Sequence, residues 1–359
     1  MREKRVMFFL GSMGRGGAER VVSHISDFFS NKGWKVYIVL LLFNKVEYEL
    51  NEHIEVINLT GGGGSRIKRI PYWITGIRRL VKVYRPDEII SFAARINIIV
   101  QLACVGLKKR IIVSERNDPY MDGRTKIVDI LTSILYPKAK KIVFQTKRAE
   151  SYFGKLSLKN SIIIPNPIYV DSRRCEVTEN KIVTVGRLTK QKNQELLINA
   201  FSEIHSKYPQ YKLYIYGDGE LYSELNNLVK QLSIDDSVVF AGNVPNVHEM
   251  ISTAEMFVLP SNYEGLSNAL LEAMIMGIPC ISTRCAGSDE YIVNGENGLL
   301  VDVGDEDGLK NAMLKFIENS SLRDSCGNNA KNIIERVSKE VVLEKWYKLA
   351  SAEGIEKYE

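Results

Sequence analysis

The chain has 359 residues, which excludes one ordinary domain and suits two, each able to bury its own core. The five cysteines form no CxxC pair, which argues against a disulfide framework or structural zinc, and no apolar run reaches the roughly 18 to 20 residues of a membrane span. The formal net charge is +5, but the charges are unevenly distributed. Residues 1–170 contain 29 Lys and Arg against 14 Asp and Glu, and the remaining residues contain 19 against 29. The basic first half makes a phosphorylated substrate, nucleic acid and an anionic membrane surface candidate partners.

Short apolar runs alternate with helix-length segments. In chain order the runs are KRVMFFL, YIVLLLF, DEIISF, KRIIVSE, KKIVFQT, NSIIIPNP, KIVTVG, YKLYIYG, SVVFAG, MFVLP and GIPCIST. This alternation predicts parallel sheets built from βαβ units. A proline-containing polar stretch near residues 166–180 predicts a linker between two α/β domains, and the glycine run 61–64 predicts a flexible loop.

The first predicted strand leads into the glycine-rich stretch GSMGRGGAER. Its spacing is not GxGxxG, and the second strand ends without the acid that would hold a dinucleotide's ribose, so nicotinamide chemistry is disfavoured. Gly16 and Gly17 stand at the start of the next helix, where backbone can approach a phosphate closely. A tight turn without a ligand is the alternative.

Residues 66–85 predict a basic amphipathic helix. Trp73, Ile77, Leu80, Val81 and Tyr84 share one face, and Arg78, Arg79, Lys82 and Arg85 lie opposite. Such a helix can lie on an anionic bilayer, or it can pack its apolar stripe on the first sheet as a crossover helix. Both interpretations hold if Arg66, Lys68 and Arg69 alone face lipid.

The loop GRLTKQKN follows the first strand of the second half and carries Arg187 and Lys192. We expect Asn193 to cap the next helix. Cations near the positive end of a helix dipole are mildly unfavourable unless an anion binds there, so this pair indicates a phosphate site. Two solvated loop cations are the alternative.

Two acids follow the strand MFVLP. Glu264 falls in a loop, either Ser267 or Asn268 caps the following helix, and Glu272 lies in the second turn of a helix that is apolar nearly all round. A buried carboxylate needs hydrogen-bond donors, which the vicinal hydroxyls of a ribose would supply to Glu272. The alternative places Glu272 on a polar stripe facing solvent.

The histidines do not predict a catalytic or metal site. They are His24, His53, His205 and His248, and none follows a strand beside a Ser, Cys or Asp. Ser/His hydrolysis and metal binding are therefore unsupported, and we predict no metal ligands.

The motifs GRLTKQKN, YIYGDGE, FAGNV, VLPSNYEGLSNALLEAM, GIPCIST and GENGLLV, taken in order, resemble those of the retaining glycosyltransferases of family 4. The first half agrees through GGAERV, RPDEIISF and IPNPI. The resemblance implies the GT-B fold, an α/β fold of two Rossmann-like parallel-sheet domains facing a cleft. Residues 1–168 would bind the acceptor, residues 169–335 the nucleotide sugar, and a C-terminal helix in 336–359 would pack back on the first domain.

The implied activity is metal-independent transfer of a sugar from a nucleotide-diphosphate sugar, for which we expect UDP, without a cofactor. The acceptor would be a hydroxyl of a glycan or polyprenyl-linked glycan in bacterial surface polysaccharide synthesis. We expect a cytoplasmic protein with no nucleic-acid partner, and a peripheral position on the inner face of the cell membrane stays open. A nucleotide-sugar epimerase of the same fold and a non-catalytic anion-binding protein are the rival hypotheses.

Roles are carried over by position. The resemblance makes Arg187, Lys192 and Glu264 catalytic, the two cations gripping the diphosphate and the acid contacting the transferred sugar. Further donor-binding positions are Gly16, Gly17, Gly186, Asn243, Val244, Gly265, Leu266, Ser267 and Glu272. The segment SERNDP departs from the family pattern, since Glu115, Arg116 and Asn117 stand where many relatives carry a histidine, and we place these three on the acceptor side.

Overall fold

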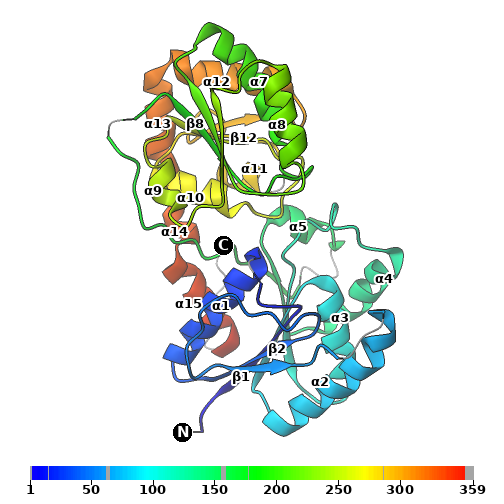
Figure 1. Cartoon of the computed structure of the whole chain (residues 1–359). Helices are drawn as coiled ribbons and strands as arrows, with labels where there is room; N and C mark the ends of the chain where they lie inside the picture. The colour runs from blue at the N-terminus through cyan, green and yellow to red at the C-terminus, as the bar shows by residue number, and fades with distance from the viewer. Residues whose placement is uncertain are drawn as a thin grey trace. The chain divides into compact units, whose positions relative to one another are not determined.

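The computed structural model describes residues 2–14, 16–61, 65–154, 159–176, 178–285 and 287–351. Except for Gly61, the predicted glycine loop lies outside these ranges. The chain divides into two compact units, Met1–Pro167 with Lys339–Glu359, and Ile168–Ser338. Each unit contains one twisted sheet with helices packed against it (Figure 1). Across the described ranges, no helix combines the length and the apolar character needed to cross a bilayer.

The first unit contains a parallel sheet of seven strands in the order β3-β2-β1-β4-β5-β6-β7. The strands are β1 Arg5–Leu10, β2 Lys35–Leu40, β3 Glu55–Asn58, β4 Glu88–Phe92, β5 Arg110–Ser114, β6 Lys141–Phe144 and β7 Ser161–Ile163. The α-helices are α1 Gly17–Asn31, α2 Ile70–Tyr84, α3 Ala94–Ala103, α4 Lys126–Leu135, α5 Lys147–Ser151 and α15 Lys339–Ser351, and short 3-10 turns cover Ile67–Arg69 and Tyr136–Lys138.

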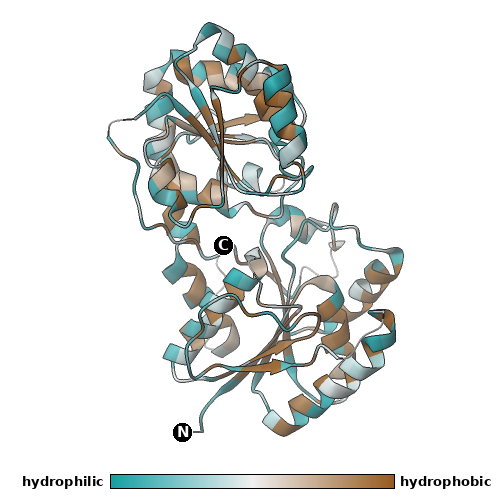
Figure 2. Ribbon diagram, viewed as in Figure 1, coloured by the Kyte–Doolittle hydropathy of each residue, from teal (hydrophilic) through white to brown (hydrophobic). Residues whose placement is uncertain are grey.

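The central strands of this sheet, β1 and β4 among them, are largely apolar on both faces because helices cover both (Figure 2). Along β1, Val6 and Phe8 belong to the core cluster that contains α1 and α15, whereas Met7 and Phe9 belong to the cluster with α2 and α3. Helix α15 comes after the second unit in sequence but packs in the first, where the Trp346 side chain is fully buried.

Helix α2 packs on the sheet as a crossover helix. Trp73, Ile77 and Val81 are buried in the core of the first unit, and the Trp73 indole N–H donates to the carbonyl of Leu59 at 3.0 Å. The predicted apolar stripe of this helix is therefore occupied by the sheet.

The second unit contains a parallel sheet of six strands in the order β10-β9-β8-β11-β12-β13. The strands are β8 Lys181–Val185, β9 Lys212–Tyr216, β10 Val238–Gly242, β11 Met256–Leu259, β12 Cys280–Thr283 and β13 Leu299–Val301. The helices are α7 Gln194–Lys207, α8 Tyr222–Gln231, α9 Val247–Ile251, α10 Asn268–Met276, α11 Ser288–Tyr291, α12 Glu306–Glu318, α13 Ser320–Ala330 and α14 Ile334–Val337, with a 3-10 turn at Lys331–Ile333. The predicted class, α/β with two Rossmann-like parallel-sheet domains, is confirmed.

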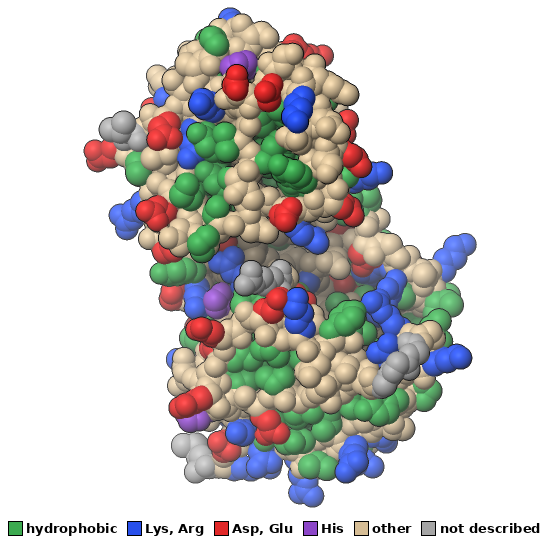
Figure 3. Space-filling view, in the orientation of Figure 1, with side chains coloured by type: hydrophobic (Ala, Val, Ile, Leu, Met, Phe, Trp, Pro, Cys, Tyr) green, Lys and Arg blue, Asp and Glu red, His purple; other side chains and the backbone are tan. Residues whose placement is uncertain are grey.

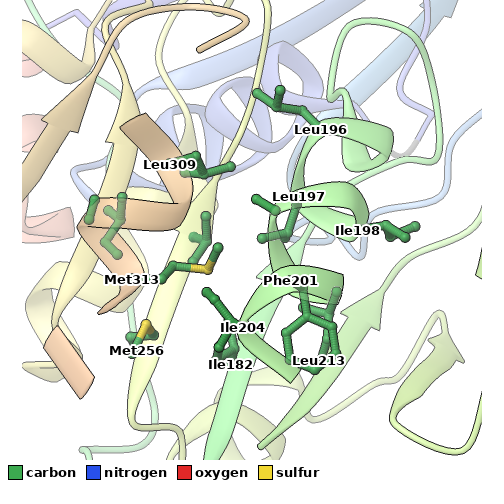
Figure 4. Packing of buried hydrophobic residues seen from close by; sticks show 14 of the residues in the cluster. Ile182, Leu196, Leu197, Ile198, Phe201, Ile204, Leu213, Met256, Leu309 and Met313 are labelled. Atoms are coloured by element: carbon green, nitrogen blue, oxygen red, sulfur yellow. The ribbon is translucent and has the colours of Figure 1, made fainter. Parts of the chain in front are cut away.

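Strand order in the second sheet locates the place for a ligand. One face of the sheet carries α7 and α12, whose side chains, such as Phe201 and Met313, interdigitate over β8 and β11 (Figure 4). From β8 the chain proceeds outward to β9 and β10, and from β11 it proceeds the other way to β12 and β13. Ligands of open α/β sheets collect at the carboxyl ends of strands where the order reverses, which here are the ends of β8 and β11.

Candidate functional site

Two loops meet at this switch point, residues 186–193 after β8 and residues 260–267 after β11. The Gln191 carbonyl accepts from the Asn262 backbone N–H at 2.8 Å, and the Gln191 side-chain amide donates to the carbonyl of Tyr263 at 3.1 Å. Strand pairing between β8 and β11 thus continues as cross-loop hydrogen bonds. The bonds hold both loops in one arrangement.

Asn193 does not cap α7, so that prediction is wrong. Its backbone is left-handed, with φ of 50°, and no side-chain cap bond forms. Instead its side-chain amide donates to the side-chain oxygen of Asn262 at 3.0 Å. An N-cap residue normally has extended backbone, which aims its side chain at the first helical N–H groups. The left-handed conformation turns Asn193 toward the neighbouring loop.

The structure brings two of the predicted catalytic residues into direct contact. Lys192 Nζ lies 2.6 Å from Glu264 Oε1, and the Ser261 hydroxyl donates to the same oxygen at 2.8 Å. Glu264 is only 6% exposed. A carboxylate this buried is costly without a cation and donors. Lys192 offsets that cost and lies between a fixed acid and any anion that binds the loop.

A helix N-terminus adjoins this ion pair. The Ser267 hydroxyl accepts from the backbone N–H of Leu270, so of the two predicted caps Ser267 is the one used. The residues just before it, Gly265 and Leu266, complete the loop that carries Glu264. The first turn of α10 contains no acid, so the positive end of its dipole is open to an anion.

An open pocket of about 250 Å³ lies beside β8 and β10. It brings together four of the predicted donor-binding residues, Gly186, Arg187, Asn243 and Val244. The other lining residues are Val185, Tyr216, Gly217, Gly242 and Val247. A pocket with aromatic, aliphatic and backbone polar groups beside an exposed arginine suits a planar ring joined to an anionic chain.

The glycines of this pocket make room for backbone and for Lys192. A Cβ on Gly186 would lie 3.1 Å from Lys192 side-chain carbons. At Gly217, φ is 130° and a Cβ would lie 2.1 Å from the carbonyl oxygen of Gly186, so only glycine fits there. Gly217 lies in the YIYGDGE motif, and the sequence did not predict this role for it.

The Glu272 carboxylate is 6% exposed and lies in the second turn of α10. Its Oε2 is 3.4 Å from Nε2 of His248, and Nδ1 of that ring is 2.7 Å from Oδ1 of Asp171. The two carboxylates raise the pKa of His248 above its ordinary value of 6.5, with the hydrogen bond to Glu272 the largest cause. This burial excludes the alternative in which Glu272 faces solvent, and its role toward a ligand stays a prediction.

One histidine, His248, makes contacts that the sequence did not predict. His248 does take part in a carboxylate–imidazole–carboxylate arrangement, which was missed because the three residues lie 77 and 24 positions apart. The predicted donors to Glu272 were the hydroxyls of a ribose, and His248 supplies a further one from the protein. In the sequence, His248 directly follows Val247, and Val247 lines the pocket.

In the first unit, Gly16 and Gly17 begin α1. Gly16 is the N-cap residue and has no side-chain cap bond; a Cβ there would lie 2.2 Å from Oε2 of Glu19. At Gly17 a Cβ would meet no atom within 4 Å. A ligand therefore has space to approach the backbone at Gly17. At Gly16 the side chain of Glu19 occupies that space, and burial raises the pKa of Glu19.

Glu115, from the predicted acceptor segment, is buried at the end of β5. It accepts hydrogen bonds from the hydroxyl of Tyr136 and, at 3.3 Å, from Arg124. Burial raises the pKa of Glu115 to about 7, against the opposing effect of the Arg124 charge. This carboxyl is held by the interior of the first unit.

Arg116 is also buried, and Asn117 is exposed. The guanidinium carbon of Arg116 lies 5.6 Å from the ring centre of Phe92 and 5.3 Å from that of Trp346, and desolvation lowers its pKa to about 9. Cation–π contacts compensate part of that desolvation. Of the three predicted acceptor-side residues, only Asn117 presents its side chain to solvent.

The chemistry that the site of the second unit favours is stabilisation of negative charge. It combines Arg187, Lys192 and a helix N-terminus with a pocket of suitable size beside them. Within the residues that the structure describes, no group of three or more His, Cys, Asp or Glu side chains could hold a metal ion.

Comparison with known proteins supports this picture. Residues 169–333 match the family model described as glycosyl transferases group 1. Over its length the chain is 29% identical to N-acetylgalactosamine-N,N'-diacetylbacillosaminyl-diphospho-undecaprenol 4-alpha-N-acetylgalactosaminyltransferase of Campylobacter jejuni, with 91% of this chain and 94% of that protein covered.

Solved structures share the fold. Sucrose-phosphate synthase from Thermosynechococcus elongatus superposes with a TM-score of 0.84 at 17% identity, covering 98% of this chain and 99% of that one. HepE of Anabaena, solved in complex with UDP, gives a TM-score of 0.84 at 16% identity, covering 97% of this chain and 100% of that one. At these identities the likeness establishes the GT-B fold.

Proposed function

We propose that the chain, a glycosyltransferase whose residues 169–333 match the group 1 family model, is a retaining enzyme that uses a UDP-sugar. The acceptor is a hydroxyl of a polyprenyl-linked glycan in bacterial surface polysaccharide synthesis. The UDP complex of HepE supports the donor, and the diphospho-undecaprenol substrate in the name of the Campylobacter relative supports the acceptor.

The Lys192–Glu264 pair beside the β8 pocket is the observation that carries this proposal. Breaking a sugar–phosphate bond puts growing negative charge on the diphosphate. Arg187, Lys192 and the N–H groups at the start of α10 stabilise that charge as preorganised donors. With these groups in place the leaving group needs no metal ion.

Glu264 and Glu272 act at the two ends of the donor. Glu264, fixed by Lys192 and Ser261, contacts the transferred sugar, and the backbone of residues 265–267 contacts the β-phosphate. Glu272 accepts from the ribose hydroxyls, while the backbone of Asn243 and Val244 faces the base. In the first unit, the backbone at Gly17 is open to a phosphate group.

Retention places the acceptor hydroxyl on the face from which the diphosphate leaves. A phosphate oxygen of the departing diphosphate then takes the hydroxyl proton, so the protein need not supply a general base. On the acceptor side, Asn117 contacts the acceptor, and Glu115 and Arg116 position its loop from the interior.

A panel of UDP- and GDP-sugars tests the proposal. We expect at least one UDP-sugar to raise the Tm by several degrees, because a ligand that binds only the folded state stabilises it, and to be consumed only when a lipid-linked glycan acceptor is added. Conversion of the donor without any acceptor would indicate the epimerase. No response to any UDP-sugar would contradict the proposed donor.

The basic helix supplies a second element of the proposal, peripheral contact with an anionic membrane. Arg66 and Lys68 are exposed beside Ile67, which is 78% exposed. By contrast, Arg69 donates to the Thr60 carbonyl, and Arg78 donates to two backbone carbonyls at the C-terminal end of α3, so the protein itself holds these two cations. Figure 3 shows Lys and Arg side chains among hydrophobic ones over the part of the first unit where Figure 1 places α2.

Replacing Arg66 and Lys68 together by glutamine should weaken binding to phosphatidylserine-containing vesicles roughly 30-fold, since each cation near an anionic surface contributes about 1 kcal/mol. Vesicle sedimentation at fixed ionic strength measures this. Lys212→Gln with Lys230→Gln, two exposed cations of the second unit, removes the same charge and should change binding little. Equal losses in both double variants would contradict a localised contact.

A further inference from the structure

His248 lies between two carboxylates. Asp171 comes from the segment before β8, His248 from α9 and Glu272 from α10. The His248 side chain is 11% exposed and that of Glu272 8%, whereas that of Asp171 is 60% exposed. The array therefore runs from the solvent-exposed Asp171 to the buried Glu272.

The geometry constrains the protonation state of the ring. A neutral imidazole has one N–H donor and one bare nitrogen that only accepts. Both nitrogens of His248 face carboxylate oxygens, at 2.7 Å and 3.4 Å. Only an imidazolium can donate to both. Deprotonation would leave a nitrogen lone pair facing one of the carboxylates. The contact to Glu272 is the longer of the two, so we expect the remaining proton to stay on the nitrogen that faces Asp171.

The location of the ring connects it to the nucleotide. Val247, the residue before it, lines the pocket with Asn243 and Val244. Glu272, the acid that it contacts, is the proposed acceptor for the ribose hydroxyls. The charged groups that face the ring are Glu272 and Asp171, and burial opposes their effect on its charge.

We propose that His248 is a positioning residue of the donor site: as an imidazolium held by Asp171, it orients Glu272 toward the ribose and supplies positive charge that favours the anionic donor. This inference rests on the proposed function. If it holds, the affinity for the donor depends on the protonation of His248, which is not one of the two acids Glu264 and Glu272.

The direction of the pH dependence follows from the charge balance. The carboxylates favour the protonated ring, so the pKa of His248 lies above 6.5. Below that pKa the ring is charged and Glu272 is held. As the pH rises through it, the Glu272 contact and one positive charge are lost, and donor binding weakens.

The protonation state is tested first, without any ligand. NMR titration of the imidazole resonances should give His248 a pKa above 6.5 in the wild-type protein. Asp171→Asn, which removes one carboxylate and leaves the ring in place, should lower that pKa. A wild-type pKa at or below 6.5, or no change in Asp171→Asn, would overturn the proposal whichever donor the enzyme uses.

Donor binding is tested second, by calorimetry with UDP-glucose at constant ionic strength. UDP-glucose is chosen because UDP itself carries a terminal phosphate that titrates near pH 6. Wild-type affinity should fall roughly 10- to 30-fold between pH 6 and pH 8.5, the lower part of the range for one hydrogen bond to a charged group. His248→Gln, which keeps an N–H donor but no charge, should bind weakly with a flat profile.

His205→Gln is the matched control, because His205 contacts Ser237 and does not line the pocket. It should keep the wild-type profile. A flat wild-type profile, or a His248→Gln profile as steep as the wild-type one, would overturn the positioning role. If the wild-type protein bound no UDP-glucose at any pH, the proposed donor would fail instead, and the NMR titration would still decide whether His248 carries the charge.

Discussion

Lys192→Ala should lower kcat about 100-fold, the loss typical of removing one preorganised donor that stabilises developing charge. KM should change less, because the cation matters most when the diphosphate leaves. The same substitution leaves the buried Glu264 without its cation, which adds a cost to the folded state. Steady-state rates and a thermal unfolding curve of the same preparation separate the two effects.

Lys190→Ala is the control for this variant. Lys190 is exposed in the same loop, and its backbone carbonyl, which accepts from Asn262, survives the change. It should retain nearly full turnover. If Lys192→Ala were folded and turned over at a rate close to that of Lys190→Ala, Lys192 would have no part in the mechanism.

Glu272→Ala should weaken UDP-glucose binding roughly 100-fold, because two hydrogen bonds from ribose hydroxyls to an ionised acceptor are lost. Calorimetry near pH 6, where His248 is charged, gives the largest difference. Glu249→Ala, an exposed acid on the neighbouring helix α9, controls for loss of negative charge near the site and should bind normally. Unchanged affinity in Glu272→Ala would refute its ribose role.

Much of the fold could be predicted from the sequence because the spacing of apolar residues that distinguishes strands from helices is visible within short segments. The apolar runs at KIVTV and MFVLP are buried on both faces of a parallel sheet, and their alternation with helices implies the rest. Lys192 and Glu264 could be placed for the same reason. Residues that follow adjacent parallel strands meet at one edge of the sheet.

What the sequence could not show depends on contacts between distant segments. The cap predicted at Asn193 failed because hydrogen bonding to Asn262 outweighed the local preference. Asp171, His248 and Glu272 have no common motif, and only the packing of α9 against α10 brings the last two together. Arg116 sits in a polar segment that reads as exposed, yet Trp346, 230 residues later, covers its guanidinium.

The contact between Glu272 and the donor's ribose is tested most directly by a cycle that pairs a protein change with a ligand change. UDP and 2′-deoxy-UDP are each titrated into the wild-type protein and into Glu272→Ala. Removing the ribose hydroxyl should weaken binding about 10-fold in the wild-type protein and hardly at all in Glu272→Ala, since the hydroxyl has then lost its partner. An equal loss in both proteins would mean that Glu272 does not bind the ribose and would contradict the account.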